Sequence, residues 1–377
     1  MAEFELTRHY VDDPTGPAEV KFYPGMHGYF VTDPALGLKN KRMGGGTSIT
    51  GLMNKGDALM KWPMNEMSKY LNTYFESTTL KDIVDDPDTT IEAILRAGKA
   101  AHTNKSDKGK SVGTDAHAWV EAYSNELQSS QENKTKFKAP AVPEVEDIAA
   151  ILKKGYIRVI NDLKPKELDD FKRLPKLIFK EIEIQERLWA EAVMVRQSIL
   201  GAKEWLEQHD IIVHGAEGTV YSRKYAVCGK YDADWVVTCT KKCDWCYRNG
   251  DSKLEAKDFT GRYVVDFKST NASTYAPKGI YPEYLAQCAV YEIGLIEEFP
   301  DRSYDGYLIL NGSKVPAVDK KTGEEFPLFN THFSFNNKAH RTWAENLAVL
   351  KEQIFLANNE MKGSNAGIKI PKKTATK

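Results

Sequence analysis

Alternating apolar and polar positions in the C-terminal half of the chain predict a run of β-strands. Residues 211–223, 229–238 and 262–270 alternate with a period of two and are rich in β-branched side chains. A helix is predicted from Pro282 to about Glu298, and a further strand at residues 304–310. Strands interleaved with helices in this way favour an α/β fold.

The N-terminal half has a mainly helical pattern. Apolar residues at helical spacing predict one helix through Trp62, a second through Ile94 and long amphipathic helices over residues 144–208. The polar run at residues 103–114 predicts a loop, and residues 116–127 predict the next helix. This half is therefore expected to form a helical subdomain against the sheet.

Changes of pattern along the chain predict four segments. The first is a strand-and-turn segment, the second is mainly helical, the third contains the sheet, and the last is a basic, flexible tail. Their bounds are 1–45, 46–210, 211–360 and 361–377.

Composition and charge narrow the class of protein. Of 377 residues, 41% are hydrophobic and 28% charged, which permits a sizeable core and excludes wholesale disorder. The charges nearly cancel (52 − 53 = −1), which excludes a strongly basic protein but not a locally positive groove. We find no apolar run long enough to span a membrane and no signal-peptide pattern, so a cytoplasmic protein is expected.

Acidic residues and a lysine are expected on one surface of two neighbouring strands. Alternation places Asp232 and Asp234 on the same face of their strand, and Asp266 and Lys268 on one face of the next. Carboxylate oxygens are the ligands that Mg²⁺ prefers, and a lysine beside them can orient a water molecule. The alternative is a solvated strand face with an Asp–Lys ion pair.

Helical spacing adds further candidates. Gln287 and Tyr291 lie four residues apart on one helical face, and His117 and Glu121 have the same spacing. Glu217 lies in the strand before Asp232 and offers a further acid. An imidazole and a carboxylate on one face could complete a metal site, although a lone helical histidine is more often structural.

The order of these motifs resembles the PD-(D/E)XK nuclease superfamily. It is most similar to the RecB-like exonuclease branch, which includes phage exonucleases and the mitochondrial genome maintenance exonuclease. The matching residues are Gly113 to His117 (G-x-x-x-H), Glu217, Gly229 to Asp232 (G-x-x-D), Asp266 to Lys268 (D-x-K) and Gln287 to Tyr291 (Q-x-x-x-Y). The resemblance implies a restriction-endonuclease-like core, a mixed central sheet flanked by helices, with His117 supplied by the helical region.

The resemblance also implies a role for each matching residue. Asp232 and Asp266 would bind one or two Mg²⁺ or Mn²⁺ ions, and Lys268 would position or activate the attacking water. Gln287 and Tyr291 would organise the lysine and the DNA strand. The further metal ligands implied are His117, the backbone carbonyl of Phe267 and, more loosely, Glu217.

The function implied is that of a metal-dependent DNA exonuclease. Its substrate would be DNA with a free end, and a recombination or replication protein is an expected partner. If the chain is phage-encoded, the compartment is the host cytoplasm. Two alternatives stay open: an endonuclease or nickase on the same fold, and a catalytically inactive DNA-binding module. A zinc-organised interaction scaffold is a third.

Cysteines and aromatic residues give weaker signals. Cys239, Cys243 and Cys246 have C-x3-C-x2-C spacing in a predicted hairpin (239–246), with Cys228 nearby in sequence. They predict either a Zn²⁺ or iron–sulfur site or simply free thiols. The loop after the D-x-K strand offers further DNA contacts, which are Tyr275, Lys278 and Tyr281.

Overall fold

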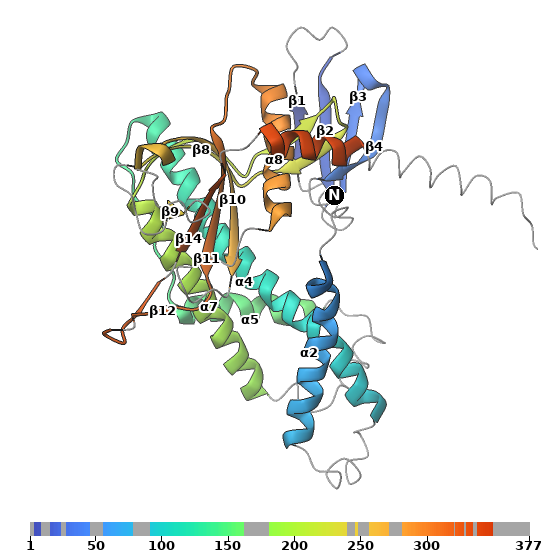
Figure 1. Ribbon diagram of the computed structural model, residues 1–377, viewed down its shortest axis with the longest axis vertical. Coiled ribbons are helices and arrows are strands. Elements are labelled where there is room, and N and C mark those ends of the chain that lie inside the picture. The colour runs from blue at the N-terminus through green and yellow to red at the C-terminus, as the bar shows by residue number, and fades with distance from the viewer. Residues whose placement is uncertain are drawn as a thin grey trace, which may run out of the picture.

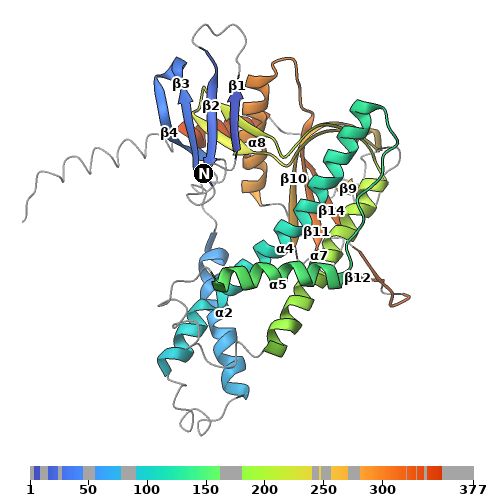
Figure 2. The same ribbon diagram turned by 180° about the vertical axis from the view of Figure 1, so that it is seen from behind.

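Two six-stranded sheets with helices packed against them make the described part of the chain a mixed α/β protein (Figures 1 and 2). A small two-stranded sheet pairs β12 (Ala317–Val318) with β13 (Glu325–Phe326). The computed structural model describes residues 4–8, 16–23, 28–45, 56–77, 91–161, 181–239, 246–247, 256–270, 281–319, 321–327, 329–334 and 338–349. The predicted tail at 361–377 lies outside these residues.

The central sheet joins strands of the C-terminal half in the order β5-β8-β10-β11-β14-β9. It is mixed, because β10 pairs in parallel with β11 and antiparallel with β8. The strands predicted at 262–270 and 304–310 correspond to β10 and β11. The bounds are β5 (Asp210–Ala216), β8 (Ala233–Thr238), β10 (Gly261–Thr270), β11 (Gly306–Ser313), β14 (Phe329–Ser334) and β9 (Cys246–Tyr247).

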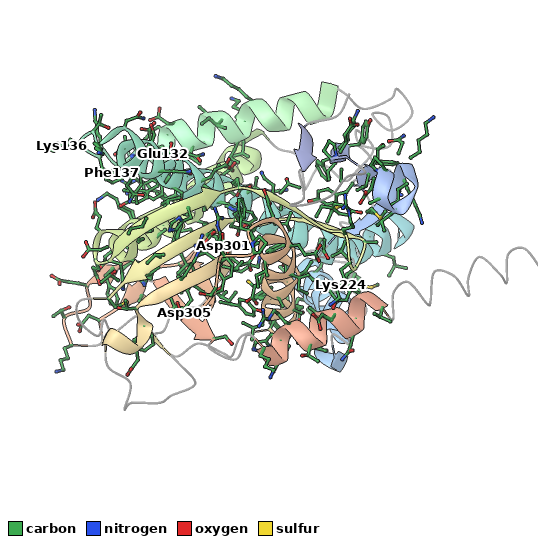
Figure 3. All side chains as sticks on the ribbon, turned by 90° about the horizontal axis from the view of Figure 1, so that it is seen from above. Glu132, Lys136, Phe137, Lys224, Asp301 and Asp305 are labelled. Carbon is green, nitrogen blue, oxygen red and sulfur yellow. The ribbon has the colours of Figure 1, made fainter. Side chains whose placement is uncertain are left out.

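Helices cover both faces of the central sheet, because successive side chains of its strands alternate between two apolar cores. Phe267 of β10 packs in a core shared with α4 (Ile91–Asn133) and α7 (Glu181–Glu207). Val264 packs on the other face against α8 (Pro282–Glu298), the helix predicted over the same residues. Seen from above, the strands run between the green helices and the orange α8 (Figure 3).

The second sheet joins four N-terminal strands to two strands from the middle of the chain. Its order is β1-β2-β3-β4-β7-β6, with β4 and β7 parallel. The buried Asp33 ties its two halves together by accepting hydrogen bonds from Tyr221 Oη (3.1 Å) and Arg223 Nε (2.8 Å). The bounds are β1 (Phe4–Arg8), β2 (Ala18–Tyr23), β3 (Gly28–Asp33), β4 (Leu38–Gly45), β6 (Thr219–Ser222) and β7 (Val227–Lys230).

Two strands that the sequence predicts as continuous are each divided between the two sheets. The predicted strand at 211–223 becomes β5 in the central sheet and β6 in the second sheet. The predicted strand at 229–238 is divided in the same way into β7 and β8. Alternation alone cannot reveal these breaks, because the hydrophobic period continues across them while the partner strand changes.

The helical region differs from the prediction at one point. Residues 103–114 form no loop, because α4 runs through them from Ile91 to Asn133. Local polarity and two glycines favoured a loop, but a continuous helix lets α4 reach from α2 (Gly56–Ser77) to the central sheet (Figure 1). The short helix α5 (Val145–Asn161) packs on α7. Among the described residues, no helix combines the length and apolar character needed to cross a bilayer.

Candidate metal centre and active site

Three side chains of metal-ligand type meet where the chain passes between the two sheets. His117 comes from α4, Glu217 from the break between β5 and β6, and Asp232 from the break between β7 and β8. Nε2 of His117 lies 2.6 Å from Oε1 of Glu217 and 3.4 Å from Oδ1 of Asp232. One ligand atom of each residue lies within 4.8 Å of the other two, so this group could hold a metal ion.

Backbone hydrogen bonds between the two breaks hold Glu217 beside Asp232. Glu217 N donates to Asp232 O over 2.9 Å, and Tyr231 N donates to Gly218 O over 2.9 Å. Glu217 has a φ of 51°, in the left-handed region that is unfavourable for a residue with a side chain. A Cβ at position 218 would collide with the Tyr231 hydroxyl, so this position requires glycine. Strain is thus tolerated where it brings two carboxylates together.

Asp266 and Lys268 form a buried ion pair next to this group. Lys268 Nζ lies 2.7 Å and 2.6 Å from the two carboxylate oxygens of Asp266, and Asp266 is 0% exposed. The backbone N–H of Phe267 donates to Asp232 Oδ2 over 2.6 Å, which joins the pair to the metal-ligand group. The alternative of a solvated strand face is therefore wrong.

The electrostatics of the group favour an added cation. Burial and the charge of Asp266 raise the pKa of Asp232 to about 7. Burial disfavours a charged imidazole at His117, but the carboxylates of Glu217 and Asp232 outweigh it and raise its pKa to about 8. Burial likewise opposes charge on Lys268, yet Asp266 and Asp232 raise its pKa. The clustered carboxylates favour bound protons here, and they would favour a bound metal ion for the same electrostatic reason.

The chemistry of the donor set fits a divalent ion. Nε2 of His117 is buried and, despite its short distance to Glu217, makes no hydrogen bond of acceptable geometry. A covered ring nitrogen without a hydrogen bond is suited to bind a metal ion held between His117 and the carboxylates of Glu217 and Asp232. Carboxylate oxygens suit Mg²⁺ and Mn²⁺, and one imidazole extends the range to softer divalent ions.

Helix α8 places Gln287 and Tyr291, its two predicted site residues, at the candidate site. Gln287 Nε2 donates to Tyr291 Oη over 2.5 Å, and the ring of Tyr291 is buried against Gly229. A Cβ on Gly229 would collide with that ring, which explains why the G-x-x-D and Q-x-x-x-Y motifs fit together. Sequence reasoning missed Tyr284, whose ring centroid lies 5.0 Å from Lys268 Nζ. Its spacing of three residues before Gln287 could have revealed it.

Lys230 and Glu121 stand at the edge of the metal-ligand group. The ammonium of Lys230 forms an ion pair with Oε2 of Glu217, and its side chain is 46% exposed. Burial opposes ionisation of Glu217, but His117 and Lys230 outweigh burial and lower its pKa. Burial and the field of Glu217 raise the pKa of Glu121. No pattern in the sequence pointed to Lys230, because the break between β7 and β8 is set by the fold.

Asp234 does not belong to the site, although alternation placed it beside Asp232. Its buried carboxylate accepts hydrogen bonds from Arg262 Nε (2.8 Å) and Nη2 (2.6 Å). Arg302 Nη1 (3.2 Å) and Tyr304 Oη (2.9 Å) donate to it as well. Asp232 precedes the first residue of β8, so the period-two rule does not link the two acids.

The cysteines do not form the predicted shared metal site. Cys228 lies buried in the core of the second sheet, and Cys239 in the central core, where its thiol donates to Phe259 O over 3.8 Å. Cys246 lies in β9, four strand intervals from β8, or about 19 Å away. Zinc requires sulfurs within about 4.6 Å of one another. Cys239 and Cys246, the two ends of the predicted hairpin, therefore do not lie side by side, and Cys243 lies outside the described residues.

Of the predicted DNA contacts, the structure describes Tyr281. It is 56% exposed at the start of α8, and its ring packs edge-to-face on that of Tyr284 with centroids 5.5 Å apart. Tyr281 thus contacts Tyr284, whose ring in turn lies beside Lys268. Tyr275 and Lys278 lie outside the described residues.

A cavity of about 500 Å³ among the described residues lies at the opposite end of β5 and β8. Its lining is mostly apolar and includes Phe137, which is labelled in Figure 3. It contains no predicted site residue, so the metal-ligand group is the better candidate for chemistry.

The candidate site combines a metal-ligand group, a buried Asp–Lys pair and the amide and phenol of α8. Such a set can hold a divalent ion and place an ammonium beside it. No protein-family model and no curated protein matches this chain. Its function therefore has to be argued from these residues.

Proposed function

We propose that this protein is a metal-dependent DNA nuclease of the PD-(D/E)XK type, and that it acts as an exonuclease. The observation that carries this proposal is the convergence of His117, Glu217 and Asp232 beside the Asp266–Lys268 pair. These residues match the order of the superfamily motifs, although they come from separate elements. A purely structural ion pair would need neither the nearby imidazole nor the strained Glu217.

His117, Glu217, Asp232 and Asp266 are the residues that would hold one or two Mg²⁺ or Mn²⁺ ions. The bound ion would act as a Lewis acid and offset the charge of a phosphodiester against the acids of the site. Phe267 adds a backbone contact, since its N–H fixes the orientation of the Asp232 carboxylate. Its carbonyl remains a proposed ligand.

Lys268 is proposed to orient the attacking water and stabilise charge on the phosphoryl group. Asp266 holds its ammonium through both carboxylate oxygens, and the ring of Tyr284 lies beside it. The raised pKa of Lys268 keeps the ammonium charged, which favours electrostatic stabilisation over proton abstraction by the lysine. Gln287 and Tyr291 would fix the remaining side of the site through their mutual hydrogen bond.

The substrate proposed is DNA with a free end, and the exposed Tyr281 is suited to stack on a base near that end. A recombination or replication protein would be the expected partner. An endonuclease and a binding module without catalysis are the competing functions, and one experiment separates all three.

That experiment digests end-labelled linear single- and double-stranded DNA beside a closed circle, in Mg²⁺, Mn²⁺ and EDTA. We expect metal-dependent loss of linear DNA that spares the circle and is lost in Lys268→Ala. Lys203→Ala is the matched control, because Lys203 pairs with Glu207 on α7 outside the site. Cutting of the circle would indicate an endonuclease. Binding of DNA without cleavage under any metal would overturn the catalytic assignment.

A further inference from the structure

Asn311 is the one partly exposed residue of β11, a mostly apolar strand beside the proposed catalytic lysine. Every other residue of β11 is buried. The parallel register pairs Lys268 of β10 with Asn311. Paired residues of neighbouring strands lie on the same face of a sheet, about 4.8 Å apart. Asn311 is therefore next to Lys268 on the face that α8 covers.

The apolar packing on this face ends at Asn311. Tyr307 and Ile309 precede it on the same face of β11 and are fully buried in the core with α8. The Asn311 side chain makes no hydrogen bond to another described residue, although it is only partly exposed. The amide keeps contact with solvent, because Asn311 contributes no atom to the covered, unpartnered polar atoms of the described residues, and it can therefore donate to a ligand that arrives from solvent.

The strand order gives the direction of the proposed contact. β10 lies between β8 and β11, so Asp232 and Asn311 lie on opposite sides of Lys268. A nucleic-acid strand that places one phosphate at Asp232 and Lys268 can continue past the β8 side or past the β11 side of Lys268, beyond the residues that α8 covers. The β8 side holds Asp234, whose carboxylate is occupied by two arginines and a tyrosine. The β11 side offers a neutral amide with two donors.

We infer that the Asn311 side chain donates a hydrogen bond to the backbone phosphate next to the scissile phosphate, and so sets the path of the substrate strand over β11. This inference rests on the proposed nuclease function. An amide suits the position because it can donate to a phosphate oxygen without adding an acid to a site already crowded with carboxylates.

The test is DNA binding in Ca²⁺, measured by fluorescence anisotropy with labelled oligonucleotides of two unrelated sequences. Asn311→Ala is expected to weaken binding roughly tenfold, since it removes one hydrogen bond to a charged group. Asn311→Asp should weaken it further, because a carboxylate would face the phosphate. Asn311→Ser, a smaller change at a partly exposed position, should lose less than Asn311→Ala.

Asn133→Ala is the matched control. Asn133 lies at the end of α4, sixteen residues or about 24 Å along the helix from His117, and hydrogen-bonds to Ser129 of the same helix. Its binding should equal that of the wild type. Asn133→Ala, Asn311→Ala and Asn311→Ser should keep wild-type Mn²⁺ affinity and melting temperature, which shows that the metal site and the fold are intact.

A methylphosphonate scan of the oligonucleotide identifies the contact. Each phosphate of the oligonucleotide is replaced in turn by an uncharged methylphosphonate. Replacement of the contacted phosphate alone should make the wild type and Asn311→Ala bind the DNA equally well. If wild-type protein binds DNA and the Asn311 variants bind equally well, the inference is wrong and the nuclease proposal stands. If the loss depends on base sequence, the phosphate contact is wrong. If the wild type neither binds nor cuts DNA, both proposals are overturned together.

Discussion

Asp232 and Asp234 are separated by one residue and have opposite environments, with Asp234 fully buried and Asp232 partly exposed. Asp234 is neutralised by Arg262 and Arg302 and accepts a further hydrogen bond from Tyr304. Asp232 receives a backbone N–H and a neighbouring imidazole, and burial with the nearby Asp266 raises its pKa to about 7. The protein therefore compensates the charge of the Asp234 carboxylate fully, but not that of the Asp232 carboxylate.

This contrast separates a structural acid from a candidate metal ligand. A buried carboxylate with two guanidinium partners is satisfied within the fold and has little to offer an added ion. A partly buried carboxylate crowded by another acid is stabilised by an added positive charge. Residue type and spacing are the same for both, so only their partners distinguish them.

The largest effect is expected for Asp232→Asn. Removing this ligand should lower cleavage and Mn²⁺ affinity by at least about 100-fold, because even supporting residues around metal ligands cost 10- to 100-fold. Without metal, the free energy of unfolding should stay equal or rise, since a disfavoured buried charge is removed. Calorimetric Mn²⁺ titration and urea unfolding in EDTA measure the two effects. Wild-type Mn²⁺ affinity in this variant would contradict the assignment of Asp232.

Asp234→Asn should produce the reverse pattern. It leaves Arg262 and Arg302 without their carboxylate, and breaking a buried ion pair lowers the free energy of unfolding by about 3–5 kcal/mol. Mn²⁺ affinity, measured well below the melting temperature, should be unchanged. A large loss of Mn²⁺ affinity with unchanged unfolding would show that the roles of the two aspartates are exchanged.

Gly229→Ala should have an intermediate effect. The added Cβ would lie against the Tyr291 ring, with Cδ1 at 2.8 Å, and overpacking of this kind costs about 1–3 kcal/mol. Gly98→Ala in α4 is the matched control, because its Cβ would meet only ordinary contacts at 3.4 Å and should favour the helix. Thermal unfolding compares the two. Equal stability of both variants would show that the Gly229–Tyr291 contact is not tight.

The smallest effect concerns His214 near the Asp234 network. Burial and the charge of Arg262 lower its pKa below 6.5, so the folded state favours the neutral ring. The unfolded chain therefore takes up the proton first, and this contribution to stability is present above pH 6.5 and lost as the pH falls through the folded-state pKa. When the pH falls from 7 to 5, the free energy of unfolding, measured with urea, should decrease less for His214→Gln than for the wild type. An equal loss in both proteins would exclude a role for this histidine.

Several features could be predicted because they depend on local pattern. The period-two alternation of residues 262–270 gave β10, and the helical spacing after Pro282 gave α8. The pairing of Asp266 with Lys268 and of Gln287 with Tyr291 followed from spacing of two and four residues. These predictions succeeded because neighbours on one element meet whatever that element packs against.

Other features could not be predicted because they depend on distant partners. The polar run at 103–114 looked like a loop, but packing of α4 overrides its weak helix propensity. Cys239 and Cys246 are seven residues apart in the chain, yet the strands between β8 and β9 separate them. The short distance between these cysteines in the sequence therefore led to a wrong prediction of a shared metal site.

The amino-acid sequence by itself determined the residue types of the candidate site and their spacing within each strand and helix. The tertiary structure decided that Glu217 and Asp232 lie at breaks where the chain changes sheets, so that both carboxylates meet His117. It also decided that Asp234 turns to two arginines instead. The physical reason is that alternation fixes the face on which a side chain lies, while the charges it meets come from elements far away in the sequence.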